Sequence, residues 1–320
     1  MKAAVSSPNG LELRDIPQPV PKPNEVLTRV KACGLNRADL SAARATYGHG
    51  TMGAPVGLEW AGEVAAVGAG VTDFKPGDRV VCSGNGGYAE YAVSDYGRTI
   101  PLPEGFSFEQ AAVLPVALHT LHNALITQGR LKTGESVLIQ GASSGVGVMG
   151  LQIAKMKGAK PVIGSATNDA RRARLKDFGA DLAIDTRDET WPDHVLQATG
   201  GKGVNLTVDM VSGPTVNQTM RATAVLGRIV NVGRLGGVKA EFDFDLHAMK
   251  RIDYIGVTFR TRSVEEVREI VRLMRADLWD AVTSGKLRLP IDKAFPLAEA
   301  VAAQAHMRAN RHFGKIVLTM

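Results

Sequence analysis

A glycine-rich stretch in the middle of the chain, GASSGVG at residues 141–147, constrains the possible folds most strongly. A short apolar run, SVLIQ, precedes it, and the segment GVMGLQIAKMKG follows. In that second segment Met149, Ile153 and Met156 fall on one face of a helix. A strand, a glycine-rich turn and a helix in this order bring unpaired N–H groups and the positive end of the helix dipole to the turn. The stretch therefore predicts a phosphate-binding turn.

The turn departs from the dinucleotide fingerprint G-x-G-x-x-G, because it keeps only the last glycine. Small residues stand at the other two glycine positions, so the backbone can still approach a ligand closely. The predicted phosphate contacts are the hydroxyl groups and backbone of four residues: Ser143, Ser144, Gly145 and Val146. The alternative is a turn of the same shape that binds nothing. For Ser144 two roles stay open: a hydrogen bond to the pyrophosphate, or only a slight displacement of the loop.

Strands and helices alternate after residue 135, which indicates βαβ units and a parallel sheet covered on both faces. The expected strands lie at residues 136–140, 160–166, 181–185, 205–211, 227–233 and 252–259, with helices at 147–158 and 169–179. Before residue 107, short apolar runs separated by Pro and Gly predict a barrel-like β domain. A helix at 107–126 with a break near Pro115, a long helix at 264–285 and a final strand, GKIVLT, suggest a return to the first domain.

Charge and cysteine content exclude several classes of protein. The formal net charge is +6, but the basic residues are spread out and only 5% of residues are aromatic, which disfavours a nucleic-acid-binding module. Two cysteines, Cys33 and Cys82, cannot build a disulfide framework or a multi-cysteine zinc site. With no secretory leader and no run of apolar residues long enough to span a membrane, we expect a cytoplasmic protein.

The second expected strand of the parallel sheet ends without an acidic residue, at Gly164-Ser165-Ala166-Thr167. An acid there would hold the ribose 2′-hydroxyl of NAD. Ser165 and two arginines, Arg171 and Arg172, are present instead, and a guanidinium group can bind a 2′-phosphate through two hydrogen bonds. The pattern favours NADPH, with Arg171 or Arg172 as the phosphate ligand. The alternative is an ordinary solvated helix face.

Eight motifs in a fixed order resemble the zinc-independent medium-chain dehydrogenases/reductases of the NADPH:quinone oxidoreductase type. They are GLNRADL, GLEWAGEVAAVG, KPGDRVV, GGYAEYAV, LPVALHTLHNAL, GASSGVG, GRIVNVGRLGG and RHFGKIVL. The resemblance covers essentially the whole chain. It implies an α/β protein with a GroES-like β-barrel catalytic domain, residues 1–117 and 262–320, and a doubly wound Rossmann NADP-binding domain, residues 118–261.

The resemblance also bears on metal binding. In the zinc enzymes of the same superfamily, Cys, His and Cys ligate the catalytic metal. The resemblance implies that the first two correspond here to Asn36 and Leu58, and that the second Cys falls at or near Val116. Leu and Val cannot ligate zinc, and Asn is a poor ligand. The expected site therefore has no metal. The neighbouring Arg37 and Asp39 either orient the site or tie the loop down.

The remaining site residues are carried over from the resemblance one by one. It implies that Asn36 lies beside the nicotinamide and donates a hydrogen bond to an acceptor oxygen, and that Tyr47 can donate a proton or a hydrogen bond to substrate. Thr120 matches a position on the nicotinamide side. Gly233 would let the backbone approach that ring, and Lys315 either reaches a cofactor phosphate or is a surface lysine.

These expectations define a zinc-independent reductase that transfers hydride from NADPH to a quinone or a similar conjugated carbonyl compound. Two alternatives stay open: an NADPH-dependent 2-alkenal or enone C=C reductase, and a low-turnover NADPH-binding sensor or nucleic-acid-binding module. The family resemblance implies a homodimer, with a tetramer as the second option, and no membrane partner is expected.

Overall fold

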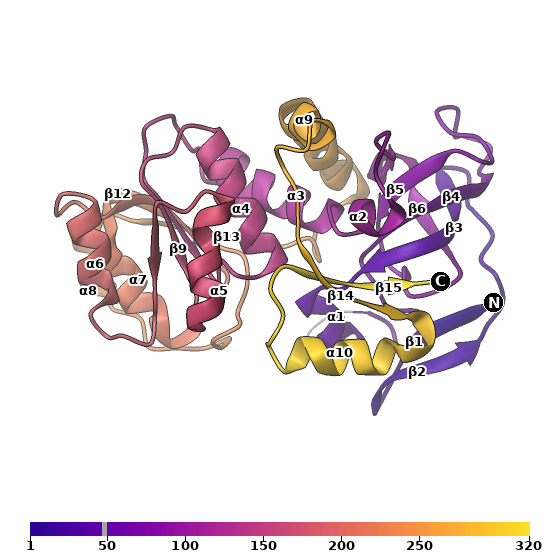
Figure 1. Cartoon of the computed structure of the whole chain (residues 1–320), viewed down its shortest axis with the longest axis horizontal. Coiled ribbons are helices and arrows are strands. Elements are labelled where there is room, and N and C mark those ends of the chain that lie inside the picture. The colour runs from indigo at the N-terminus through magenta and orange to yellow at the C-terminus, as the bar shows by residue number, and fades with distance from the viewer. Residues whose placement is uncertain (47–49) are drawn as a thin grey trace. The chain divides into compact units, whose positions relative to one another are not determined.

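The computed structural model describes residues 1–46 and 50–320, which form two units. The first unit comprises Met1–Val116 and Arg260–Met320, and the second comprises Ala117–Phe259. Figure 1 shows the course of the chain through both units. Within the described residues, we find no helix with the length and apolar character needed to cross a membrane.

The second unit is built on a parallel sheet whose strands lie in the order β10-β9-β8-β11-β12-β13. The strands are β8 (Val137–Gln140), β9 (Val162–Ser165), β10 (Leu182–Ile184), β11 (Val204–Asp209), β12 (Thr223–Asn231) and β13 (Asp253–Gly256). Their short apolar runs are almost entirely buried in β8, β9 and β11 because helices cover both faces of the sheet. The doubly wound sheet that the sequence predicts is confirmed.

Helices cover the two faces of this sheet in two groups (Figure 1). On one face lie α4 (Gly145–Met156) and α5 (Asp169–Ala173), and α4 packs against β8 and β9. On the other lie α6 (Trp191–Ala198), α7 (Val216–Ala222) and α8 (Phe244–Lys250), which contact one another in sequence. The chain runs outward from β8 in one direction and from β11 in the other. The boundary between β8 and β11 is therefore the switch point where open α/β sheets bind their ligands.

The first unit contains a sheet in which β3 is the central strand, pairing with β4, β6 and β15. Its strands are β3 (Glu25–Gly34), β4 (Glu59–Val67), β5 (Arg79–Ser83), β6 (Tyr91–Asp95), β7 (Thr99–Pro101), β14 (Ile291–Pro296) and β15 (Lys315–Thr319). A separate hairpin joins β1 (Lys2–Ser7) to β2 (Gly10–Asp15). Trp60 and Tyr88, both fully buried, are among the largest side chains of the core.

Three helices of the described residues begin or break where the sequence indicates. Ser107 caps α2 (Phe108–Ala112) in a reciprocal pair with Gln110, and Pro115 opens α3 (Pro115–His122), so the expected break is real. A π-helical segment, Asn123–Gln128, continues α3. Ser263 caps the long α9 (Val264–Thr283) in the same way as Ser107 caps α2. Helix α10 (Ala300–Arg308) packs against β14 and β15, and α1 (Arg37–Ala42) packs against α10.

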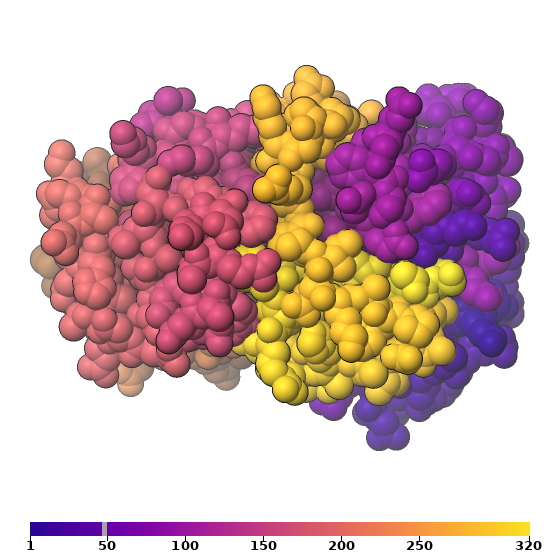
Figure 2. All heavy atoms as spheres, in the orientation of Figure 1, coloured from indigo at the N-terminus to yellow at the C-terminus, as the bar shows by residue number. Residues whose placement is uncertain are grey.

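The C-terminal residues return to the N-terminal part of the first unit. Strand β15 runs antiparallel to β3, with Val317 opposite Gly34. In the space-filling view the C-terminal residues, in yellow, lie directly against N-terminal residues in indigo (Figure 2). This return brings Lys315, at the start of β15, next to the segment that follows β3.

Candidate active site and nucleotide site

A buried polar cluster lies at the end of β3 in the first unit. Lys315 Nζ donates to Glu59 Oε1 at 2.5 Å, to Leu35 O at 2.7 Å and to Asn36 Oδ1 at 2.8 Å. Asn36 Nδ2 donates to Glu59 Oε1 at 3.0 Å, and Val116 N donates to Glu59 Oε2 at 2.8 Å. Glu59 is fully buried, and Lys315 and Asn36 are 3% and 7% exposed. The three side chains therefore form one closed network.

Lys315 does not fit the expected contact with a cofactor phosphate. An ammonium group has three N–H donors, and all three have acceptors in this network. Its burial also removes it from the surface, so the alternative of a surface lysine is wrong as well. The pairing of Lys315 with Glu59 could not be predicted from the sequence, because Glu59 is 256 positions away in the chain.

Asp39 ties the beginning of α1 to the core. Its Oδ2 accepts hydrogen bonds from Asn36 N at 2.7 Å and from the Tyr88 hydroxyl at 2.7 Å. Burial raises the pKa of Asp39 to about 7, although the hydrogen bonds from Tyr88 and Asn36 oppose the shift. Of the two expected roles, orienting the site and tying the loop down, the arrangement favours tying the loop down.

The glycine-rich turn of the second unit begins α4. Ser144 is the N-cap: its Oγ accepts from Gly147 N at 3.1 Å and donates to Gly141 O at 2.9 Å. The single proton of the Ser144 hydroxyl is thus directed into the turn, and its expected phosphate contact stays a prediction. A Cβ at position 147 would lie 2.6 Å from Ala142 Cα, so the last glycine of the fingerprint is needed for the tight turn.

The N-terminus of α4 leaves donors for an anion. Helix geometry gives the N–H groups of Gly145 and Val146, at the first two helical positions, no acceptor within the helix. Ser143 lies half-buried beside them. Ser165, expected as a cofactor contact, is 2% exposed and its Oγ accepts from Gly141 N at 3.0 Å. Ser165 thus stabilises the shape of the turn, and its expected contact with the cofactor stays a prediction.

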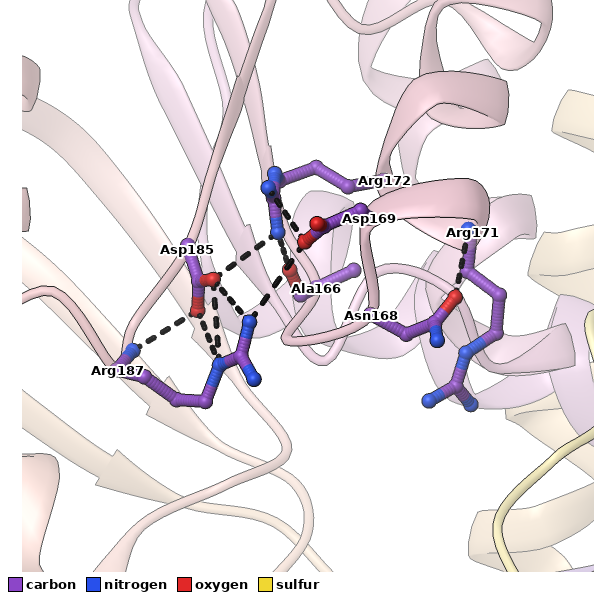
Figure 3. A network of polar contacts seen from close by, with 7 residues as sticks. All are labelled: Ala166, Asn168, Asp169, Arg171, Arg172, Asp185 and Arg187. Atoms are coloured by element: carbon purple, nitrogen blue, oxygen red, sulfur yellow. Dashed lines mark hydrogen bonds and ion pairs between the residues drawn. The ribbon is translucent and has the colours of Figure 1, made fainter.

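A cluster of two arginines and two aspartates lies beyond β9 (Figure 3). Arg172 donates to Ala166 O and Asp185 Oδ2, each at 3.1 Å, and to Asp169 Oδ1 at 2.9 Å. Arg187 forms a second ion pair with Asp185 at 2.6 Å and, chiefly through its hydrogen bond, lowers the pKa of Asp185 to about 2. Of the two candidate phosphate ligands, Arg172 is thus committed to this cluster.

The Arg171 side chain points away from this cluster (Figure 3). Its backbone N–H donates to Asn168 Oδ1 at 3.0 Å, and its guanidinium group lies on the opposite side of Asn168 from the cluster (Figure 3). Partial burial lowers the pKa of Arg171, which nevertheless stays charged at neutral pH.

The carboxyl ends of β11 and β12 carry a further polar network. Asp209 Oδ1 accepts from the backbone N–H groups of Val211 and Ser212 at 2.8 and 2.9 Å, and Ser212 Oγ donates to Gly233 O at 2.8 Å. A Cβ at position 233 would lie 2.7 Å from Met210 O. Packing against Met210 therefore requires glycine at position 233, and the expected approach of the backbone to the nicotinamide ring stays a prediction.

The other predicted features of the site are Tyr47, Thr120 and the lack of a metal. Tyr47 lies outside the described residues. Thr120 lies half-buried on α3, and His119 beside it is 2% exposed. Among the described residues no group of three or more His, Cys, Asp or Glu side chains could hold a metal ion.

Sequence reasoning missed Glu59, Tyr88 and Asp185. The signal for Glu59 was present, since a carboxylate directly precedes the apolar residues Trp60 and Ala61 of strand β4 and must find a partner when buried. Asp185 also had a signal, as an acid directly after a short apolar strand. Tyr88 carried none, because its partner Asp39 depends on the tertiary fold.

Two family models match the chain. The model described as alcohol dehydrogenase GroES-like domain matches residues 22–104, and the one described as zinc-binding dehydrogenase matches residues 145–276. The chain is 32% identical to a quinone oxidoreductase of Rattus norvegicus, over 98% of this chain and 94% of the relative.

Solved structures of oxidoreductases are similar to this chain over its whole length. A mycobacterial protein complexed with NADPH has a TM-score of 0.91 at 28% identity, covering 100% of both chains. A protein described as an NAD-dependent alcohol dehydrogenase has a TM-score of 0.86 at 29% identity, also covering 100% of both chains.

The two units thus define an oxidoreductase with a GroES-like domain and a Rossmann-like nucleotide-binding domain. The chain belongs to the medium-chain dehydrogenase/reductase family, and within it the chain is similar to the quinone oxidoreductases.

Proposed function

We propose that this oxidoreductase uses NADPH, without zinc, to reduce a quinone or a similar conjugated carbonyl compound. The observation that carries the proposal is the buried Asn36 amide, whose carbonyl oxygen and nitrogen are each held by a charged partner. A fixed amide N–H can stabilise negative charge on an acceptor oxygen without reorganising during the reaction. Quinones and conjugated carbonyl compounds need little activation beyond that.

The residues at the turn fit the nicotinamide cofactor, which supplies hydride when bound. The N–H groups of Gly145 and Val146 and the Ser143 hydroxyl would bind the pyrophosphate at the positive end of α4. Thr120 is retained as a proposed contact on the nicotinamide side. Arg171 would bind the 2′-phosphate, since Arg172 already has an acceptor for each of its terminal nitrogens.

The residues do not fit a catalytic zinc ion. Asn36, Leu58 and Val116 offer no thiolate or imidazole where the zinc enzymes of the superfamily have them. In addition, the Lys315 ammonium lies against Asn36 and Glu59, so a cation placed there would be repelled. We therefore assign no step to a metal.

A panel of acceptors tests the function. The metal content of protein purified without a chelator is measured, and the protein is assayed with NADPH and NADH against 9,10-phenanthrenequinone, 2-alkenals and simple alcohols, before and after dialysis against EDTA. We expect quinone turnover with NADPH and no stoichiometric metal. Preferred turnover of 2-alkenals would support the C=C reductase, and no turnover with any compound would support the NADPH-binding sensor. About one zinc ion per chain would refute the metal-free site.

We also propose a homodimer. Strand β13 is an edge of the parallel sheet in the part of the chain that the structure describes, and apolar side chains lie exposed on and near it. Phe244 and Met249 are 76% and 67% exposed. An open sheet edge with apolar neighbours is suited to pairing with a second copy. Light scattering should give a mass near twice 34.0 kDa, and a mass of 34.0 kDa would contradict the dimer.

The proposed location is the cytoplasm. Cys33 and Cys82 are both free and buried, as expected in a reducing compartment. Cell fractionation would test this, and recovery from an oxidising compartment would contradict it.

A further inference from the structure

We propose that Lys315 is a positioning residue, which acts with Glu59 to fix the orientation of the Asn36 amide toward the acceptor. The inference rests on the proposed role of Asn36 as hydrogen-bond donor to the acceptor. Lys315 itself is buried and has no N–H left for a ligand. Its effect on the reaction must therefore pass through Asn36.

The charges of the two partners decide which way the amide faces. The amide oxygen of Asn36 accepts from the Lys315 ammonium, and the amide nitrogen donates to the Glu59 carboxylate. Rotating the amide by half a turn would place its NH₂ group against the ammonium and its oxygen against the carboxylate. Both contacts would be repulsive, and burial strengthens the repulsion because water cannot screen it. The ion pair thus selects one of two amide orientations that have nearly the same shape.

The network also shows which hydrogen of Asn36 can serve an acceptor. One Nδ2 hydrogen is used by Glu59 at 3.0 Å. The other faces Gly34 O at 3.5 Å, which is at the limit of a hydrogen bond. This weakly held N–H is the one that an acceptor oxygen would take. Without Lys315 the amide could rotate and present its oxygen, which cannot stabilise negative charge.

The Glu59 carboxylate is itself fixed in position, so it can fix the orientation of the Asn36 amide. Its second oxygen accepts from Val116 N at 2.8 Å, and its first oxygen packs against Gly34. A Cβ at position 34 would lie 2.5 Å from Glu59 Oε1, so only glycine leaves room for the carboxylate. The backbone on both sides of the network therefore fixes the ion pair, and the ion pair fixes the amide.

A purely structural ion pair is the competing explanation, and a double-mutant cycle separates the two. The kcat for quinone reduction is measured in the wild type, Lys315→Met, Asn36→Ala and the double variant. If Lys315 acts through Asn36, Lys315→Met should lower kcat by about tenfold in the wild type and by less than about twofold in Asn36→Ala. An equal loss in both backgrounds would overturn the proposal.

Two further proteins control for stability. Arg268→Met breaks another half-buried ion pair of the same unit, with Asp95 at 2.6 Å, and should leave kcat within about twofold of wild type. If Lys315→Met does not fold because Glu59 is left unpaired, the charge-neutral pair Lys315→Met with Glu59→Gln replaces it in the cycle.

A spectroscopic measurement keeps the proposal testable without turnover. In protein labelled with ¹⁵N-asparagine, the side-chain amide signals of Asn36 are identified by their loss in Asn36→Ala. They should shift and broaden in Lys315→Met, and unchanged signals would overturn the proposal. Absence of quinone turnover in the wild type would refute the proposed function alone, and the amide signals would then decide the role of Lys315.

Discussion

Replacing Asn36 with alanine should lower kcat for quinone reduction by about 10- to 100-fold, because removing one fixed donor to a developing oxyanion typically has effects of this size or larger. The Michaelis constant for NADPH should stay within about twofold, because the proposed hydrogen bond goes to the acceptor and not to the cofactor. Steady-state kinetics at saturating NADPH with a varied quinone concentration measure both constants.

The matched control is Asn205→Ala. Asn205 is an asparagine of the second unit whose Oδ1 accepts from Ser136 N at 3.0 Å, and it lies outside the proposed machinery. This change should reduce stability without a selective loss of kcat. Unchanged turnover in Asn36→Ala would remove Asn36 from the mechanism, and a loss confined to NADPH binding would assign it to the cofactor instead.

Replacing Arg171 with alanine should raise the Michaelis constant for NADPH by about 10- to 100-fold, since hydrogen bonds to charged groups contribute about 1.5–3 kcal/mol each. The Michaelis constant for NADH, which has no 2′-phosphate, should change little. The ratio of kcat/KM for the two cofactors therefore reports directly on the proposed contact, and wild-type protein should favour NADPH.

Arg172→Ala provides the decisive comparison. Arg172 is bound to Asp185, Asp169 and Ala166 O, so its loss should lower stability while leaving the cofactor preference nearly unchanged. The opposite pattern, with the preference lost in Arg172→Ala and kept in Arg171→Ala, would exchange the two roles. Arg221→Ala, which changes an exposed arginine paired with Asp193, controls for the loss of one positive charge.

The parallel sheet could be predicted because its strands are short apolar runs that alternate with helices and glycines. The caps of α2 and α9 carry a local signal, since Ser107 and Ser263 each precede an acid or amide at the third helical position. Helices α6, α7, α8 and α10 were not predicted. They are at most nine residues long, so their hydrophobic periodicity is too brief to identify a helix.

Among the site residues, those in a local motif could be predicted, and those that depend on contacts distant in sequence could not. Gly145 and Val146 belong to a local motif, and the strand–turn–helix context located them at the start of α4. The position of Lys315 beside Asn36 follows from the pairing of β15 with β3, which joins residues far apart in sequence. A lysine in a short C-terminal motif carries no sign of that contact, so its burial could not be foreseen.

The most direct test of the account is a single-turnover experiment. Metal-free protein loaded with NADPH is mixed with 9,10-phenanthrenequinone in the absence of oxygen, and oxidation of the nicotinamide is followed in wild type and Asn36→Ala. We expect one equivalent of NADPH to be oxidised per site, at least about tenfold more slowly in the variant. Oxidation that requires added zinc, or equal rates in the two proteins, would contradict it.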